Sequence, residues 1–277
     1  MNYIYKLNSS VIKDRLRIKP ALVIVLGFLT VIIVGTILLM LPISSRSREW
    51  TSPITAFFTA TSATCVTGLV VVDTYTYWSL FGQIVIILLI QTGGIGFMTM
   101  ATLFSLLLKR NIGISERLVM AQGLNMGDMS GIVRLTKTVL LGTLTFEGIG
   151  ALILSIRFSS DFGWAKGIYF GVFHSISAFC NAGFDLMGGV QPFSNLTYYA
   201  DDIVVNVVIM SLIVIGGLGF YVWSDISRCK GFKGLSVYSK VVLIVTSILI
   251  FGGAFAFTIF EHNNPLINDN LGIKGRI

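Results

Sequence analysis

Two stretches of the chain share one pattern: residues 62–69 read SATCVTGL, and residues 177–184 read SAFCNAGF. In each, a glycine stands three residues after a cysteine. Each also ends a short helix-compatible segment, residues 51–63 and 165–179. Apolar segments of about 10–14 residues are too short to span a bilayer and are candidates for re-entrant elements. The recurrence at equivalent places predicts that both stretches enter the membrane and return to the same side.

Long uncharged runs flank these two stretches. The chain is 54% hydrophobic and only 12% charged, whereas a soluble domain has roughly 25% charged residues. Each run reaches the roughly 20 residues that a helix needs to cross the hydrocarbon core. The predicted spans are residues 22–41, 78–108, 135–156, 203–224 and 241–260. The sequence therefore predicts an all-α integral membrane protein.

The elements repeat along the chain as a span, a short re-entrant segment and a second span. A glycine cluster marks the second span of each unit, at residues 93–96 and again at 216–219. The pattern predicts two complete helix–pore-loop–helix units and the first span of a third, which leaves the chain truncated at its C-terminal end. The expected segments are a cytoplasmic N-terminal segment (1–19), the first unit (20–110), a cytoplasmic linker (111–131), the second unit (132–226), a second cytoplasmic linker (227–237), and the first span and tail of an incomplete third unit (238–277).

We interpret the net charge of +7 as a sign of how the chain is oriented in the membrane, and not of nucleic-acid binding. Of the 20 lysines and arginines, 14 precede the first span, lie between the second and third spans (with Lys137 at the start of the third), or lie between the fourth and fifth spans. Loops rich in lysine and arginine stay in the cytoplasm. The N-terminus is therefore expected inside, in a multi-pass protein of the cell membrane.

The two repeated stretches have the chemistry of a cation filter. An ion that leaves water needs its hydration shell replaced, and rings of backbone carbonyls can do this. Glycine suits such a loop because it adopts backbone angles that other residues avoid. The triplet Val66-Thr67-Gly68 has this character.

These residues give the chain a specific resemblance. It resembles the pore-forming membrane subunit of the Trk/Ktr/HKT superfamily of potassium transporters, with the bacterial Ktr subunits nearest, over residues 15–260. Four units surround a pore in that family, and each contributes one filter glycine, here Gly68 and Gly183. The resemblance implies two ion-binding filter segments, whose residues are Val66, Thr67, Gly68, Asn181, Ala182 and Gly183.

The resemblance also implies function and partners. It implies potassium uptake by a homodimer that carries no cofactor and is gated by a cytosolic nucleotide-binding regulatory subunit, docked on the basic regions 109–137 and 228–240. The alternatives are a sodium-permeable or cation–proton symporting relative and a non-conducting fragment. Glycine rather than serine at position 68 favours potassium. An enzyme is not expected, because the sequence offers no nucleophile–base pair or metal constellation inside the membrane.

Acidic residues supply further candidates. Glu147 lies within a predicted span, where an ionised carboxylate is costly. We interpret it as an intramembrane anchor for a pore loop, with a role in the ion pathway as the alternative. Asp185 is the foremost candidate for an acid at the outer mouth, where negative charge concentrates cations. Three other acids on the predicted outer side, Asp73, Asp201 and Asp202, are either further mouth acids or solvated surface groups.

The remaining motifs have structural interpretations. The glycine clusters indicate close helix packing, with helix bending as the alternative. His174 is expected to be a packed side chain. Cys65 and Cys180 are expected to be small buried residues rather than a disulfide.

Overall fold

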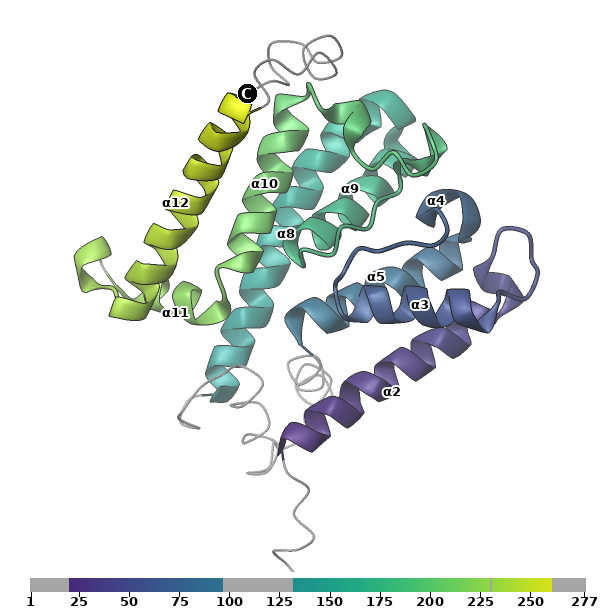
Figure 1. Ribbon diagram of the computed structural model, residues 1–277, viewed down its shortest axis with the longest axis horizontal. Helices are drawn as coiled ribbons and strands as arrows, with labels where there is room; N and C mark the ends of the chain where they lie inside the picture. The colour runs from purple at the N-terminus through teal and green to yellow at the C-terminus, as the bar shows by residue number, and fades with distance from the viewer. Residues whose placement is uncertain (1–19, 97–131, 230, 261–277) are drawn as a thin grey trace, which may run out of the picture.

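The computed structural model describes residues 20–96, 132–229 and 231–260. Within these ranges the regular structure is helical, apart from one isolated bridge between Ser45 and Trp78. Two groups of helices lie side by side, and a long helix stands at the edge of the second group (Figure 1). We call residues 20–96 the first unit and residues 132–229 the second unit.

The first unit holds a long helix, a short helix and a second apolar helix. Its helices are α2 (Pro20–Met40), α3 (Pro53–Thr64), α4 (Thr74–Tyr77) and α5 (Leu80–Ile95), with a 3-10 turn at Pro42–Ser44. Pro53 is the first residue of α3, a position that suits its fixed φ and missing amide hydrogen. The hydroxyl of Ser79 caps α5 by accepting from the amide of Gly82. Sequence and structure agree closely on α3, which was predicted at residues 51–63.

The second unit repeats this order, and its first two helices are longer than those of the first unit. It contains α8 (Ile132–Phe162), α9 (Trp164–Phe179), α10 (Ile203–Gly217) and α11 (Phe220–Arg228), with 3-10 turns at Met187–Gly189 and Thr197–Tyr199. Gly163, with φ at 79°, makes the turn between α8 and α9. The two helices approach closely because a Cβ on Gly167 or Gly171 would overlap Ser159 or Ser155 of α8. Such small-residue contacts are typical of helices packed in membranes.

The predicted fourth span, residues 203–224, is not one straight helix. α10 ends at Gly217 and α11 begins at Phe220, with a bend of 93° between the two. Gly219 has a φ of 84°, a left-handed angle that ends the helical path. The predicted span is therefore a bent pair of helices, and the last glycine of the cluster turns the chain.

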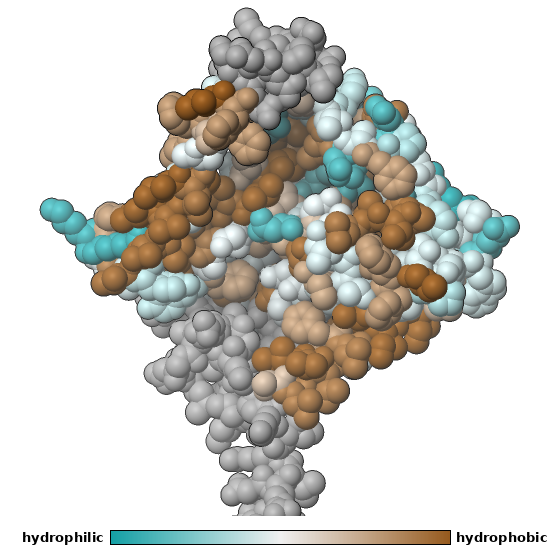
Figure 2. Space-filling model, in the orientation of Figure 1, coloured by the Kyte–Doolittle hydropathy of each residue, from teal (hydrophilic) through white to brown (hydrophobic). Residues whose placement is uncertain are grey.

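The third unit is represented by α12 (Val237–Phe260), which follows a 3-10 turn at Phe232–Gly234. Three described helices are long and apolar enough to cross a membrane: Ala21–Met40, Thr136–Phe162 and Val237–Phe260, and the bent pair adds a fourth if it counts as one span. Hydrophobic side chains cover the outer faces of α2 and α12 (Figure 2). The rest of the predicted 78–108 span, the N-terminal segment, the first linker and the C-terminal tail lie outside the described residues.

Side-chain contacts between α9 of the second unit and α4 and α5 of the first join the two units. The hydroxyl of Tyr169 on α9 donates to Oε1 of Gln83 on α5 at 2.9 Å. The rings of Tyr75 and Phe170 meet edge to face, with centroids 5.6 Å apart. These contacts place the loops that follow α3 and α9 beside each other.

Candidate functional site

The site is formed by two loops that follow the short helices. We name residues 65–69 the first glycine loop and residues 180–184 the second glycine loop. Each is braced by a serine in the preceding helix: the hydroxyl of Ser62 donates to the carbonyl of Leu69 at 2.7 Å, and that of Ser177 to the carbonyl of Phe184 at 2.6 Å. The same bond in both units fixes the start and the end of each loop.

The backbone of the two loops follows the same path. Val66 and Gly68 have φ angles of 57° and 72°, and the equivalent Asn181 and Gly183 have 59° and 71°. A positive φ is common for glycine and tolerated by asparagine, but it is an outlier for a β-branched residue such as Val66. Strained backbone of this kind costs about 1–3 kcal/mol and clusters at functional sites. The shared geometry marks these loops as the specialised part of each unit.

The two loops meet. A Cβ on Gly68 would lie 2.6 Å from the carbonyl oxygen of Ala182 and 3.3 Å from Cα of Gly183. Position 68 therefore excludes a side chain on two grounds, the left-handed backbone and the neighbouring oxygen. Backbone atoms of both predicted filter segments face one another at this point.

The glycine clusters hold the second apolar helix of each unit against its loop. A Cβ on Gly93 of α5 would overlap the carbonyl of Thr64, at the end of α3. A Cβ on Gly216 of α10 would overlap the carbonyl of Phe179, at the end of α9. The predicted close packing is confirmed at these positions. Gly96 and Gly219 differ, because both have positive φ and open surroundings, and the second lies at the bend of α10 and α11.

Glu147 is buried, with 5% of its surface exposed, and it joins the two units. Nε2 of Gln91 on α5 lies 3.0 and 2.9 Å from its two carboxylate oxygens. Its main-chain carbonyl accepts from the hydroxyl of Ser175 on α9 at 2.7 Å. The side-chain partner is thus a glutamine of the first unit, whereas the sequence analysis expected loop backbone.

Asp73 is 7% exposed and is a structural residue. Its Oδ1 caps α4 by accepting from the amides of Tyr75 and Thr76, and its Oδ2 accepts from the amide of Phe193 in the second unit at 2.9 Å. Burial raises the pKa of Asp73. The hydrogen bonds from Phe193, Thr76 and Tyr75 together lower it by more, so the net pKa is below the usual value. The prediction of a solvated or mouth-lining acid was wrong for this residue.

Asp185 lies next to the second glycine loop. It lines a cavity of about 280 Å³ together with Asn181 and Gly183, and its Oδ1 accepts from the amide of Met187 at 2.8 Å. Burial raises its pKa above the usual value, the hydrogen bond from the Met187 amide lowers it by less, and the charge of Asp73 adds a smaller rise.

His174 lies in the same wall of the cavity and is 2% exposed. Its Nδ1 lies 2.7 Å from the carbonyl of Phe170, and its Nε2 accepts from the amide of Leu186 at 3.3 Å. Both ring nitrogens are thereby occupied, and the aromatic rings of Phe158 and Phe173 pack against the imidazole. The predicted packed histidine is confirmed, and it also anchors the segment after the second glycine loop.

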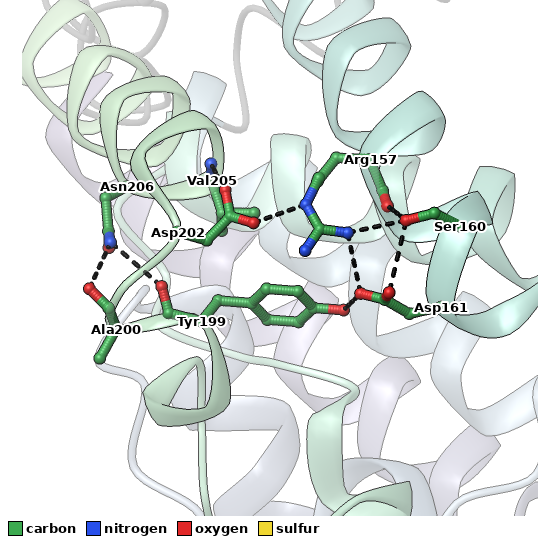
Figure 3. Close-up of polar contacts among 8 residues, drawn as sticks. All are labelled: Arg157, Ser160, Asp161, Tyr199, Ala200, Asp202, Val205 and Asn206. Carbon is green, nitrogen blue, oxygen red and sulfur yellow. Dashed lines mark hydrogen bonds and ion pairs between the residues drawn. The ribbon is translucent and has the colours of Figure 1, made fainter. Parts of the chain in front are cut away.

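An ionic network joins the outer ends of α8 and α10 (Figure 3). The guanidinium of Arg157 pairs with Asp202, which caps α10 through the amide of Val205, and with Asp161 at 2.9 Å. The hydroxyl of Tyr199 donates to Asp161 at 2.8 Å. Asp202 therefore belongs to a helix-end clamp and is not a freely solvated group.

Two further expectations concern cysteine and metal. All three described thiols are free, and Cys180 is buried as predicted, whereas Cys65 is exposed. Cys180 lies against Gly94 of α5, because a Cβ on that glycine would collide with the cysteine side chain. Among residues 20–96, 132–229 and 231–260, no group of three or more His, Cys, Asp or Glu is placed to hold a metal ion.

Gln91 and the Arg157 network were not identified from the sequence. Gln91 is one of two glutamines in the apolar run 78–108, and a glutamine in such a run could have signalled an intramembrane partner. Ser62 and Ser177 do recur in the two quoted stretches, but their bracing role depends on a loop geometry that the sequence does not state.

Comparisons with known proteins agree with this architecture. The profile of the TrkH family, described as cation transport protein, matches residues 8–241. The chain is 44% identical to the potassium/sodium uptake protein NtpJ of Enterococcus hirae and 44% identical to the Ktr system potassium uptake protein B of Bacillus subtilis, in each case over 90% of this chain and 54% of the relative. It is 35% identical to the Ktr system potassium uptake protein B of Vibrio alginolyticus, over 92% of this chain and 55% of that protein. The chain thus spans about half the length of these curated relatives, and it belongs to the TrkH cation transport protein family.

Proposed function

We propose that this chain forms part of the ion pathway of a membrane transporter that takes up potassium, and that the two glycine loops are filter segments. The main support for this proposal is that the loops share one backbone conformation and meet at Gly68 and Ala182. Carbonyl oxygens presented by such loops replace the hydration shell of a monovalent cation. The coordinating oxygens are those of Val66, Thr67, Asn181 and Ala182.

Two filter segments form part of a ring, and the second unit supports a further neighbour. Ile90 of α5 is fully buried, whereas the corresponding Ile213 of α10 is 40% exposed. The exposed face also includes Asn181 and Asp185 at the cavity beside the second glycine loop. We propose that this face packs against another helix–loop–helix unit in the working transporter.

Orientation and partners follow from the charge pattern and the relatives. We place the N-terminus in the cytoplasm, because the basic loops alternate in sidedness. Two relatives are named as parts of Ktr systems. We propose that this chain likewise acts as a dimer with a cytosolic nucleotide-binding subunit on its basic inner face, which includes Lys233 and Lys240. Residues 97–131, which hold Lys109, Arg110 and Arg117 of that face, lie outside the described residues.

Sodium is the second candidate ion. The Enterococcus relative is named for both potassium and sodium uptake. Asp185 beside the second glycine loop would concentrate either cation at the entrance, because electrostatic focusing acts on charge rather than on ion size. Discrimination between the two ions is therefore assigned to the glycine loops.

Uptake measurements test the proposal. Cells that lack their own potassium uptake systems would express the complete transporter that carries these residues, and uptake of rubidium and sodium tracers would be compared. Gly68→Ser is expected to reduce the rubidium-to-sodium ratio, because its side chain meets the Ala182 oxygen. Gly148→Ser is the matched control, since a Cβ there meets nothing within 4 Å. An unchanged ratio in Gly68→Ser would remove the glycine loops from the ion path.

A further inference from the structure

A buried polar pair connects the two units immediately behind the second glycine loop. Glu147 on α8 and Gln91 on α5 are joined through both carboxylate oxygens, at 2.9 and 3.0 Å from the amide nitrogen. Glu147 is 5% exposed and Gln91 is half-buried, so the carboxylate is largely screened from water and lipid. A buried polar group inside a membrane protein is costly unless it is paired, and such residues commonly serve function.

The pair contacts the loop itself through Cys180, the first residue after α9. The Sγ atom lies 3.9 Å from Oε1 of Gln91 and 4.0 Å from Oε1 of Glu147. Gly94, three residues after Gln91, lies so close that a Cβ there would collide with the cysteine side chain. The start of the second glycine loop is therefore enclosed by α5 of the first unit.

A second connection runs from Glu147 to the helix that carries the loop. The hydroxyl of Ser175 donates to its main-chain carbonyl at 2.7 Å. One turn further along α8, Gly150 allows Ser175 to approach, because a Cβ there would lie 2.7 Å from the serine oxygen. A single residue of α8 thus contacts α5, α9 and the loop.

The arrangement occurs at one place among the described units. Gly35 and Gly150 are equivalent, because a Cβ on either would contact Leu89 or Leu212 at the same place in its own unit. In the register of this match the first unit has Ile32 where the second has Glu147. The first glycine loop therefore has no such support from α2, and the polar pair distinguishes the two loops.

We propose that Gln91 and Glu147 are positioning residues, which hold Cys180–Gly183 in place across the boundary between the units and thereby set the ion discrimination of the second glycine loop. The inference rests on the proposed function for its effect on ions, but the geometry of the pair stands by itself. Neither residue contacts the ion in this role.

The first test measures the geometry without transport. With Cys65 and Cys229 replaced by serine, Cys180 is the remaining described thiol, and its reaction with a methanethiosulfonate reagent would be timed in membranes. Gln91→Leu and Glu147→Leu are expected to accelerate the reaction by about 3- to 30-fold, the factor equivalent to the roughly 0.6–2 kcal/mol measured for polar contacts between membrane helices. Unchanged rates in both variants would overturn the proposal.

The second test exchanges the partners. Glu147→Gln keeps an oxygen that accepts from Gln91, so it is expected to remain near wild type in both labelling rate and ion ratio. Gln91→Glu places two carboxylates together and is expected to lower the rubidium-to-sodium uptake ratio of the complete transporter. The double variant Gln91→Glu/Glu147→Gln restores one amide and one carboxylate and is expected to recover that ratio. If the double variant has the same rubidium-to-sodium uptake ratio as Gln91→Glu, the contact between the two side chains does not set that ratio.

The outcomes separate this inference from the proposed function. If Gly68→Ser changes the ion ratio and the Gln91 and Glu147 variants do not, the glycine loops remain filters and the positioning role is wrong. If Gly68→Ser has no effect either, the proposed function fails, and the labelling rates still decide whether the pair holds the loop. Should the leucine variants fail to fold, Gln91→Glu and its recovery in the double variant Gln91→Glu/Glu147→Gln still test the pair.

Discussion

The contact between the glycine clusters and the short helices can be tested by adding a single methyl group. Alanine at Gly93 would press on the carbonyl of Thr64, whose carbonyl carbon would lie 2.8 Å from the new Cβ, and alanine at Gly216 would press on the carbonyl of Phe179. Overpacking of this kind costs about 1–3 kcal/mol, and we take the upper end because the atoms encountered belong to the backbone. Alanine in a helix recovers about 1 kcal/mol relative to glycine. The expected net loss is about 2 kcal/mol for each substitution.

Thermal unfolding in detergent, followed by fluorescence-detected gel filtration, measures this loss. For a chain of this size about 1 kcal/mol corresponds to roughly 2–4 °C, so Gly93→Ala and Gly216→Ala should each lower the melting temperature by roughly 4–8 °C. Gly148→Ala is the control, because its Cβ would meet nothing within 4 Å and its melting temperature should hold or rise. If all three variants melt together, α5 and α10 do not approach the ends of α3 and α9, and the described geometry of the site is wrong.

Three further predictions concern the outer side and the orientation of the chain. Arg157→Ala should destabilise the protein by about 1 kcal/mol, as expected for a partly exposed ion pair. Lys166→Ala, the control, should have no effect. Equal melting temperatures of the two variants would show that the ionic network of Figure 3 does not stabilise the protein. The pKa of Asp73 is lower in the folded protein, so its stabilisation is present above the unfolded value of about 3.9 and is lost as the pH falls through the folded value. Melting temperatures between pH 7 and pH 3 should therefore fall more steeply for wild type than for Asp73→Asn, and parallel curves would contradict the assignment. In a cysteine-free background, a cysteine at Ser47 should react with an impermeant reagent added to intact cells and a cysteine at Ser227 should not, while the opposite result would invert the topology.

Local sequence patterns were sufficient to predict the short helices and the glycine loops. The segments predicted at 51–63 and 165–179 correspond to α3 at Pro53–Thr64 and α9 at Trp164–Phe179. This succeeded because a short apolar helix followed by a glycine turn is encoded by adjacent residues. The recurrence of the cysteine and the glycine then identified the two loops as equivalent.

Interactions between distant residues could not be predicted in the same way. Gln91 and Glu147 are 56 positions apart, and their meeting depends on how two helices from different units pack. The cluster Gly216-Gly217-Leu218-Gly219 permits both packing and bending, and only the structure shows that Gly216 packs while Gly219 turns the chain. Asp73 had the sequence character of a surface acid, since its partner Phe193 lies in the other unit.

The location of the bound ion decides whether the two glycine loops are the filter. Crystals of the complete transporter that carries these residues, soaked in rubidium or thallium salts, would give anomalous density at every ordered monovalent cation. We expect an anomalous peak within coordination distance of the backbone oxygens of Thr67 and Ala182, at the place where Gly68 and Gly183 face one another. The same peak should weaken in crystals of Gly68→Ser. Ordered cations elsewhere in the protein, with no density between the two glycine loops, would contradict the assignment of these loops as the filter.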